Sequence, residues 1–318
     1  MTTSPGPAGL VVALDIGGTK IAGGLVSSDG RIRAQVAVPT ERDGGRDPGL
    51  LASYRTAAGL LAHATEQGWS VCGLGIGVPE YVSAEGLLTS RLVLDWDVQP
   101  KELFADLGPV TVDSDVRCGA RAEARLGAGR GRSSMLYVTV GTGLSSTLVV
   151  DGVPFAGARG EAIAFGELPV DRAAAPHEKG SLENFASGQG ITDRFLRLED
   201  VPVDAPVRGA ADVIALADRG HRGAALVVDS AALALGVAIA WMVDILDPQV
   251  VVLGGGLGTS TGRWEGLVRA EYERRSAARP GAAPLERAVL GPSSGLVGAA
   301  LAHRQGEDVA SLPVESGS

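Results

Sequence analysis

The chain has 318 residues, the length of about two average domains. Its 28 basic and 37 acidic residues give a net charge of −9, so it lacks the basic surface that a nucleic-acid binder needs. Hydrophobic residues make up 45% of the chain, and no uninterrupted apolar run approaches the roughly 18 residues that span a membrane. The start resembles no secretory signal, and two cysteines provide neither a disulfide framework nor a Cys-rich zinc site. These features predict a soluble cytoplasmic protein.

The first predicted elements are short strands separated by glycine turns. A strand at 10–14 runs into Asp15-Ile16-Gly17-Gly18-Thr19-Lys20, and IAGGLV, a turn at 28–30 and the alternating RIRAQVAV follow. The same order returns at MLYVTV (135–140), where Gly141-Thr142-Gly143, LSSTLVV, an Asp-Gly turn and VPF follow. The sequence therefore predicts one structural unit that occurs twice.

The remaining elements alternate between helices and strands. Between the two copies we expect a helix at 48–67, a strand at 71–78, a helix at 100–107, a strand at 110–112 and a helix at 115–126. After the second copy we expect an irregular segment at 156–190, helices at 209–218 and 222–246, a strand at 250–253, a helix opened by glycines 254–256, a strand near 287–290 and a helix at 294–303. This alternation predicts an α/β protein with two mixed-sheet halves.

Glycine is unusually frequent, with 46 residues. Four clusters, IGGTK, GLGIGVP, VGTG and GGGLG, each follow an apolar run. Glycine allows a positive φ and a close approach of the backbone to a ligand, and tight turns are the alternative interpretation. We expect these clusters to mark places where the backbone contacts a ligand.

The first glycine turn combines groups that bind phosphate. Backbone N–H groups of Gly17 and Gly18, the hydroxyl of Thr19 and the charge of Lys20 are all suited to phosphate oxygens, although the P-loop pattern is absent. Asp15 would suit a hydrated Mg²⁺. The alternative is a hairpin with a capping aspartate.

Two further turns extend this prediction. Thr142 and Gly143 form a second phosphate-binding turn, and two such turns facing a cleft make a nucleoside triphosphate the natural ligand. Gly255 and Gly256, after the strand VVVL, would let adenine lie against the backbone. Close packing of the helix on the strand is the other interpretation.

A strand-end acid is the candidate catalytic base. The strand VTV runs into Asp113-Ser114-Asp115 at an expected helix start, where an aspartate is usually a cap. Phosphoryl transfer to an alcohol needs a carboxylate within hydrogen-bonding distance of the attacking hydroxyl. We favour Asp115 over Asp113 for this role.

Taken together, DIGGTK, Asp115, the GTG turn, GSLENFASG (180–188) and LDPQVVVLGGGL (246–257) resemble the ROK family of sugar kinases and repressors, from about residue 10 to 303. The resemblance implies a two-lobed actin-like ATPase (ribonuclease H-like) fold with a duplicated βββαβα core, and ATP-dependent phosphorylation of a sugar hydroxyl in a homodimer. By the family pattern Asp115 is the base, Gly17, Gly18, Thr19 and Thr142 line the phosphates, and Gly255 and Gly256 lie by the nucleoside.

On this pattern we expect a smaller lobe at 1–114 completed by a helix at about 294–305, a larger lobe at 115–293, and a flexible tail at 306–318. A ROK-type regulator would need a helix-turn-helix, for which the residues before the first strand are too few.

The departures from the family pattern fall at sugar contacts. The usual Asn-Asp-Ala-Asn is Ser114-Asp115-Val116-Arg117, and the usual Glu-x-Gly-His aligns with 164–167, so its Glu is Ala164 and its His is Glu167. Glu183 is retained, and in a loose alignment Arg91 replaces an Asn that precedes Trp96. The expected substrate-binding residues are Ser114, Asp115, Glu167, Glu183 and Arg91.

The family's zinc ligands are also missing. Residues 171–182 contain no cysteine, which zinc prefers together with histidine, and His177 is a lone histidine, so we expect a zinc-free member that uses ATP and Mg²⁺.

Loss of buried hydrogen-bond partners disfavours glucose as the substrate. The resemblance implies a different acceptor, because relatives with altered pockets include kinases of C7-cyclitols of the valiolone or valienol type in actinobacterial aminocyclitol pathways. The Ala/Gly/Arg-rich composition suits an actinobacterial source, so we favour such a cyclitol. The alternatives are a hexose or amino sugar, such as glucose or N-acetylmannosamine, or a non-catalytic sugar sensor.

Overall fold

The structure is a computed structural model that describes residues 9–40, 47, 49–170, 180–198, 206–279 and 281–310. It contains two compact units. Unit 1 comprises Met1–Leu126, Ala156–Glu161 and Ser293–Ser318, and unit 2 comprises Gly127–Phe155 and Ala162–Pro292.

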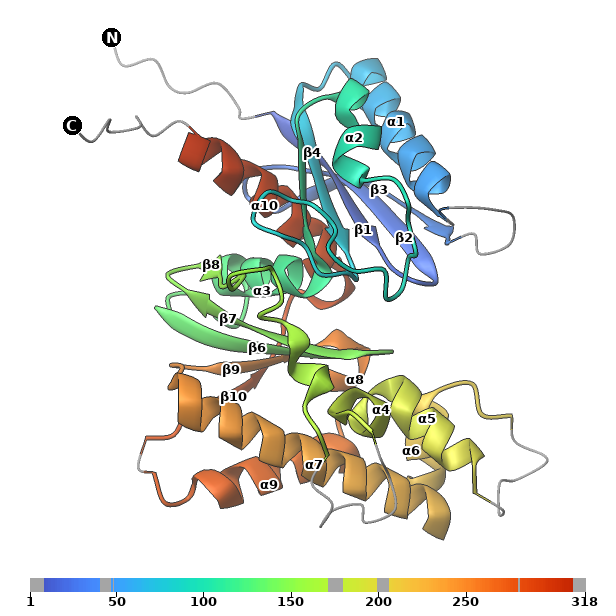
Figure 1. Cartoon of the computed structure of the whole chain (residues 1–318), viewed down its shortest axis with the longest axis vertical. Coiled ribbons are helices and arrows are strands. Elements are labelled where there is room, and N and C mark those ends of the chain that lie inside the picture. Colours follow the sequence, from blue (N-terminus) through green and yellow to red (C-terminus); the bar gives the residue numbers. More distant parts are fainter. Residues whose placement is uncertain are drawn as a thin grey trace. The chain divides into compact units, whose positions relative to one another are not determined.

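Unit 1 is built on a five-stranded sheet with helices on both faces (Figure 1). Its strands are β1 (Leu10–Ile16), β2 (Lys20–Val26), β3 (Ile32–Pro39), β4 (Val71–Val78) and β5 (Val110–Ser114). Its helices are α1 (Leu50–Glu66), α2 (Pro100–Leu103), α3 (Asp115–Leu126) and α10 (Ser294–Ala310), and a 3-10 turn covers Ala105–Leu107. The strand order is β3-β2-β1-β4-β5, with antiparallel pairs among the first three strands and parallel pairs from β1 to β5.

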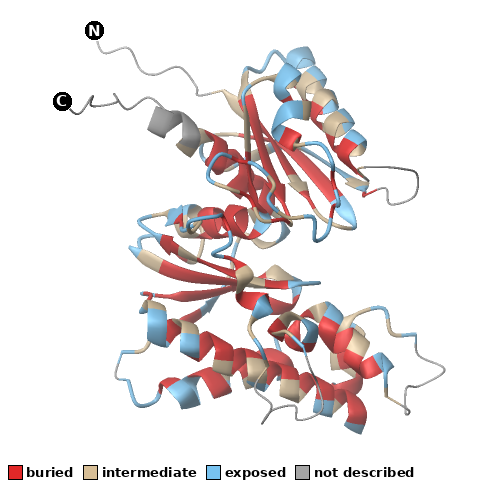
Figure 2. Ribbon diagram, in the orientation of Figure 1, coloured by how far each residue is buried: buried red, intermediate tan, exposed pale blue. Residues whose placement is uncertain are grey.

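Strand β1 separates two hydrophobic layers because successive side chains point to opposite faces of a sheet. Val12 and Leu14 belong to the core cluster that includes Leu60 of α1. Val11 and Ala13 belong to a smaller cluster that includes residues of α10. Both sides of the strand are therefore buried (Figure 2).

The glycines of β4 serve helix packing. A Cβ on Gly75 would lie 2.0 Å from the backbone oxygen of Ala299 in α10, and one on Gly73 would lie 2.3 Å from the His303 ring. A Cβ on Gly77 would contact Cys118 of α3. Alternate glycines thus let two helices lie close to this strand, and this packing explains the glycines of GLGIGVP without a ligand.

Unit 2 repeats the sheet topology of unit 1. Its strands are β6 (Ser134–Val140), β7 (Leu144–Val150), β8 (Val153–Pro154), β9 (Val251–Gly254) and β10 (Leu285–Arg287). Their order is β8-β7-β6-β9-β10, again with antiparallel pairs among the first three strands and parallel pairs from β6 to β10. The predicted duplication and the α/β fold class are confirmed.

The helices of unit 2 pack around one long apolar helix. They are α4 (Leu182–Ala186), α5 (Gly188–Leu196), α6 (Ala210–Asp218), α7 (Arg222–Leu246), α8 (Gly255–Gly258) and α9 (Arg263–Ser276), and short 3-10 turns cover Ala164–Glu167 and Gly291–Ser293. Helix α7 is long and apolar enough to pass a length and composition test for a membrane span. Twelve of its residues are buried, and it contacts α4, α5, α6 and α9, which is the pattern of a core helix.

Several boundaries differ from the sequence expectation. The first unit continues past residue 114 to Leu126, because α3 packs on α10. Helix α10 continues through 306 to Ala310, since a glycine weakens a helix by only about 1 kcal/mol relative to alanine; residues 311–318 lie outside the described part. The strand expected near 287–290 lies at Leu285–Arg287, and the segment expected to be irregular contains α4 and the start of α5.

We expect Gly298→Ala to destabilise the fold, because a Cβ there would lie 1.7 Å from the backbone oxygen of Cys118. Neither backbone can yield without moving α3 or α10, so the loss should be about 1–3 kcal/mol or more. The matched control is Gly59→Ala in α1, where a Cβ meets nothing within 4 Å. It should stabilise by about 0.5–1 kcal/mol. Urea unfolding measures the change in the free energy of unfolding for both variants. Equal changes would contradict the claim that Gly298 is needed for close packing of α3 and α10.

Candidate active site

Three parallel strands of unit 1 bring acidic residues to one edge of their sheet. Asp15 in β1 pairs in register with Gly77 of β4, and Gly77 pairs with Asp113 of β5. Strand β5 ends at Ser114, and α3 begins at Asp115. The carboxyl ends of parallel strands are the usual location of ligand sites in α/β folds.

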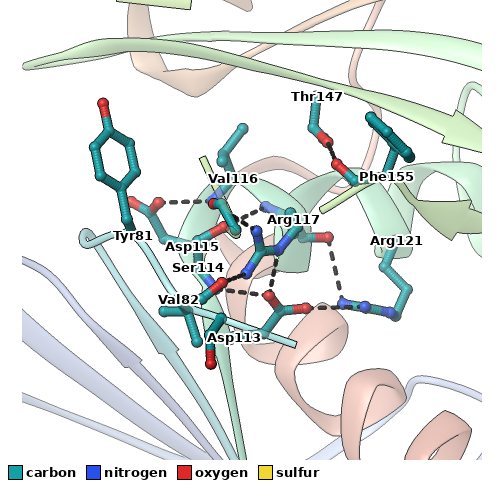
Figure 3. A network of polar contacts seen from close by, with 12 residues as sticks. Tyr81, Val82, Asp113, Ser114, Asp115, Val116, Arg117, Arg121, Thr147 and Phe155 are labelled. Carbon is teal, nitrogen blue, oxygen red and sulfur yellow. Dashed lines mark hydrogen bonds and ion pairs between the residues drawn. The ribbon is translucent and has the colours of Figure 1, made fainter. Parts of the chain in front are cut away.

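Asp113 is fully engaged by two arginines. Its Oδ1 lies 2.5 Å from Nε of Arg117, and its Oδ2 lies 2.9 Å from a guanidinium nitrogen of Arg121 (Figure 3). All three side chains are nearly buried, at 12%, 3% and 9% exposure respectively. Both carboxylate oxygens of Asp113 are therefore bound by arginine side chains, and this carboxylate serves to hold the start of α3.

Asp115 has the opposite surroundings. Its Oδ1 accepts a hydrogen bond of 2.6 Å from the backbone N–H of Val116. The residue has an accessible surface, but the protein around it desolvates the carboxyl, and this is the largest cause that raises its pKa to about 7. The negative charges of Asp15, Glu80 and Asp113 add to the effect. A carboxyl with a pKa near neutrality is suited to general-base work.

Asp15 is half-buried at the end of β1. Desolvation raises its pKa to about 6, and the charge of Lys20 opposes this shift. A Cβ on Gly295, in the first turn of α10, would lie 2.3 Å from Oδ2 of Asp15, so the carboxylate is placed against the helix N-terminus. Such a position favours the negative charge.

The turn after Asp15 is fixed from the end of β3. The N–H of Gly17 donates to the backbone oxygen of Lys20 at 2.9 Å, and the hydroxyl of Thr40 donates to the oxygen of Gly17 at 2.6 Å. The N–H of Thr40 donates to the oxygen of Thr19. Gly18 is half-buried, and Thr19 and Lys20 are exposed. The N–H of Gly17 is used inside the turn, and contact of the other predicted groups with phosphate stays a prediction.

Ser114 is completely buried. Its hydroxyl oxygen accepts the backbone N–H of Arg117 at 3.4 Å, so the side chain caps the first turn of α3. In the structure Ser114 is therefore a buried helix cap, and its hydroxyl is not exposed.

Arg91 has a half-exposed side chain that forms an ion pair with Asp97 in the same loop. Its predicted role at the substrate stays a prediction.

The corresponding turn of unit 2 is held by Glu183. The N–H of Leu144 donates to Oε2 of Glu183 at 2.8 Å, and a Cβ on Gly143 would lie 2.8 Å from the same oxygen. The oxygen of Thr142 accepts the N–H of Gln189 at 3.1 Å. The structure therefore brings the predicted phosphate turn and the predicted substrate residue Glu183 together.

The 3-10 turn at 164–167 lies against the same residues. A Cβ on Gly166 would lie 2.4 Å from the oxygen of Leu144 and 3.1 Å from Cβ of Glu183. Ala164 is half-buried and Glu167 is exposed. Glu167 thus lies one residue from a glycine that packs on Glu183.

The glycines after β9 divide between the two interpretations. A Cβ on Gly254 would collide with the Tyr137 ring, and Gly255, at φ +78°, faces the oxygen of Val140, so packing explains both residues. Gly256 has nothing within 4 Å of a Cβ position. Gly256 therefore leaves room for a ligand, and contact of Gly255 with a nucleoside stays a prediction.

Sequence reasoning missed Glu80, whose side chain is 2% exposed. It follows β4 and binds a loop that is more than ten residues away in the sequence. A carboxylate after Pro79, followed by an irregular segment, was the only local signal.

No group of three or more histidine, cysteine or acidic residues that could hold a metal ion occurs within the described residues. His177 lies outside them.

The sequence of both units together matches a known family model. The model of the ROK family matches residues 11–305. The chain belongs to the ROK family. It is 28% identical to a glucokinase of Streptomyces coelicolor, over 95% of this chain and 99% of that protein. It is 31% identical to an N-acetyl-D-glucosamine kinase of Citrobacter koseri, over 91% and 97%.

A solved ROK structure is similar over the same length. The ROK family glucokinase from Streptomyces griseus, in complex with glucose and AMPPNP, has a TM-score of 0.77 and 28% identity, over 93% of this chain and 100% of that chain. These matches confirm the predicted two-lobed kinase fold. They class the protein as an ATP-dependent phosphotransferase with an alcohol group as acceptor.

The pKa of Asp115 predicts how its replacement affects stability. A carboxyl with a pKa near 7 in the folded state and about 3.9 in the unfolded state binds more protons when folded, so the wild type loses stability as pH rises from 4 to 7. Asp115→Asn removes this loss. The variant should melt higher than wild type at pH 8, and the difference should shrink as the pH falls to 5. A difference that is constant with pH would contradict the raised pKa.

Proposed function

We propose that this ROK protein transfers the γ-phosphoryl group of ATP to a hydroxyl of a C7-cyclitol of the valiolone or valienol type, with Asp115 as the general base. The observation that carries the role of Asp115 is the contrast between two neighbouring aspartates. Arg117 and Arg121 bind the two carboxylate oxygens of Asp113, whereas the pKa of Asp115 is raised to about 7.

In the proposed step, Asp115 accepts the proton of the acceptor hydroxyl. The hydroxyl oxygen forms a bond to the γ-phosphorus, the bond from this phosphorus to the β–γ bridging oxygen breaks, and ADP leaves. At pH values above about 7 most Asp115 side chains are ionised and able to take this proton. As the pH falls through 7, the base becomes protonated and turnover should decline.

We propose that the ATP phosphates bind at the glycine turns of residues 17–19 and 142–143, with Lys20 adding positive charge. Asp15 supplies carboxylate oxygens, the donor type that Mg²⁺ prefers, and its pKa of about 6 leaves it ionised at neutral pH. The residues present thus fit a hydrated Mg²⁺. When bound, the ion would neutralise charge on the phosphates.

The preference for a cyclitol rests on the rewritten acceptor residues. Ala164 has no polar group where the family pattern has Glu, and Glu167 places an exposed carboxylate where the pattern has His. Ser114 uses its hydroxyl to cap α3. An acceptor with a primary hydroxyl but a ring unlike that of glucose suits these changes, and Glu183, Glu167 and Arg91 remain the residues proposed to contact it.

The alternative is a kinase of a hexose or amino sugar. The glucokinase and N-acetyl-D-glucosamine kinase relatives support it, since they match nearly the whole chain. A sugar sensor without catalysis is less well supported, because the candidate base and both glycine turns are present. A homodimer in the cytoplasm stays a prediction from the family resemblance.

We expect Asp115→Asn to reduce kcat by about 10²–10⁴, because the amide cannot accept the proton. The shape of the side chain is retained, so the rise in melting temperature on adding saturating Mg-ATP should equal that of wild type. Coupled ADP-release kinetics measure the first effect and thermal melting the second. Full activity in the variant would show that Asp115 is not the base.

Acceptor choice is tested with a panel of valienol, valiolone, glucose, N-acetylglucosamine and N-acetylmannosamine. We expect the highest kcat/KM for a cyclitol. The triple variant Ser114→Asn, Ala164→Glu, Glu167→His should shift the kcat/KM ratio toward glucose, with low absolute activity because supporting residues also differ. If wild type prefers glucose, the specificity argument is wrong.

A further inference from the structure

Glu80 is a buried carboxylate that gathers one loop around itself. Its Oε1 accepts the backbone N–H groups of Val93 and Leu94 at 2.7 and 2.8 Å. Its Oε2 accepts the N–H of Leu92 at 2.8 Å and the hydroxyl of Ser90 at 2.5 Å. Three consecutive N–H groups and one hydroxyl therefore converge on a side chain that is 2% exposed.

This arrangement fixes the backbone of residues 90–94, a segment with no helix or strand. Backbone donors of an irregular segment need partners, and charge-assisted hydrogen bonds to a carboxylate are stronger than neutral ones. With its N–H groups turned toward Glu80, the segment keeps the side chains of Leu92 and Val93 exposed, at 66% and 44%.

The register of the sheet places Glu80, which holds this loop, near the candidate base. Val78, the last residue of β4, pairs with Ser114, the residue before Asp115, and Glu80 follows two residues after Val78. The charge of Glu80 is one of the causes that raise the pKa of Asp115, so the two carboxylates lie within electrostatic range.

A second contact fixes the start of the loop near the same helix. The guanidinium of Arg117 donates to the backbone oxygen of Val82 at 2.7 Å and to that of Gly160 at 3.0 Å. The segment that begins at Glu80 is thus held to α3 by Arg117 and folded back by Glu80.

We propose that Glu80 is a positioning residue for the acceptor: by holding residues 92–94 beside Asp115, it forms one wall of the acceptor site. This inference rests on the proposed function, because Asp115 must be the base for the wall to face an acceptor. The exposed Leu92 and Val93 make that wall apolar, so it would pack against a carbon face of the acceptor ring.

The test compares Glu80→Gln with Glu85→Gln, which makes the same change at an exposed glutamate of the same loop. The amide introduced by Glu80→Gln has one acceptor oxygen and a donor group that faces backbone donors, so the loop should loosen. Hydrogen exchange of the Leu92, Val93 and Leu94 amides, measured without any ligand, should accelerate at least tenfold in Glu80→Gln and stay as in wild type in Glu85→Gln.

Kinetics then separate a positioning role from a structural one. For the panel member with the highest wild-type kcat/KM, Glu80→Gln should raise the acceptor KM at least tenfold, with the KM for ATP within twofold and kcat within threefold of wild type. Ser90→Ala, which removes one of the four bonds, should give a smaller rise in acceptor KM. Both variants are compared at a temperature where melting curves show them folded.

Two results would overturn the proposal. Unchanged exchange in Glu80→Gln would show that the carboxylate does not hold the loop, and faster exchange with an unchanged acceptor KM would show that the loop is no part of the acceptor site. Two other results would contradict the proposed function instead, and with it the acceptor wall: full activity of Asp115→Asn, or no phosphorylation of any panel member by wild type. In either case hydrogen exchange still shows whether Glu80 holds the loop.

Discussion

The buried guanidinium of Arg117 is the interaction on which the acidic edge of unit 1 depends. It binds Asp113, Val82 and Gly160, and so joins the end of β5, the loop after β4 and the segment at 156–161 to helix α3. A buried charge of this kind is costly unless all its donors find acceptors. Here three acceptors come from different parts of the chain, so loss of Arg117 would leave Asp113 with one cation and two carbonyls without their donor.

The carboxylates at this edge repel one another, and the charge of Asp113 still acts on Asp115 although two arginines bind it. Asp15 and Asp115 both have raised pKa values, and the larger shift belongs to Asp115, which receives the charges of three acids as well as desolvation. Like charges in a desolvated site destabilise the folded state, and such strain is typical of functional sites. The same arrangement gives a base that titrates near neutral pH. Stability and proton transfer therefore oppose each other at this position.

Much of the fold follows from local sequence signals. Helices α3 and α7 begin and end where the sequence predicts, because an aspartate stands at the start of one and Pro248 follows the other. The duplicated strand order follows from two similar runs of strands and turns. The packing role of the β4 glycines was not predictable, since a glycine beside a ligand and a glycine beside a helix look alike until the helix is placed.

The sequence predicts those residues of the candidate site that lie directly beside a recognisable strand. Asp115, Asp15 and the two glycine turns stand next to strands that mark them. Glu80 could not be found in this way, because its function depends on donors 10–14 residues away whose approach is set by the fold. Ser114 shows the converse case: the sequence suggests a substrate contact, and the structure shows a buried cap.

The division of roles between Asp113 and Asp115 is tested most directly by titrating the aspartate carboxyls. Carboxyl-carbon NMR shifts of the ligand-free protein, followed from about pH 3 to 9, should contain one resonance with a midpoint near 7 that disappears in Asp115→Asn. Because this experiment needs neither substrate nor nucleotide, it examines the electrostatics alone. If the resonance assigned to Asp115 titrates at about 4, as that of an ordinary aspartate does, the assignment of Asp115 as the general base is contradicted.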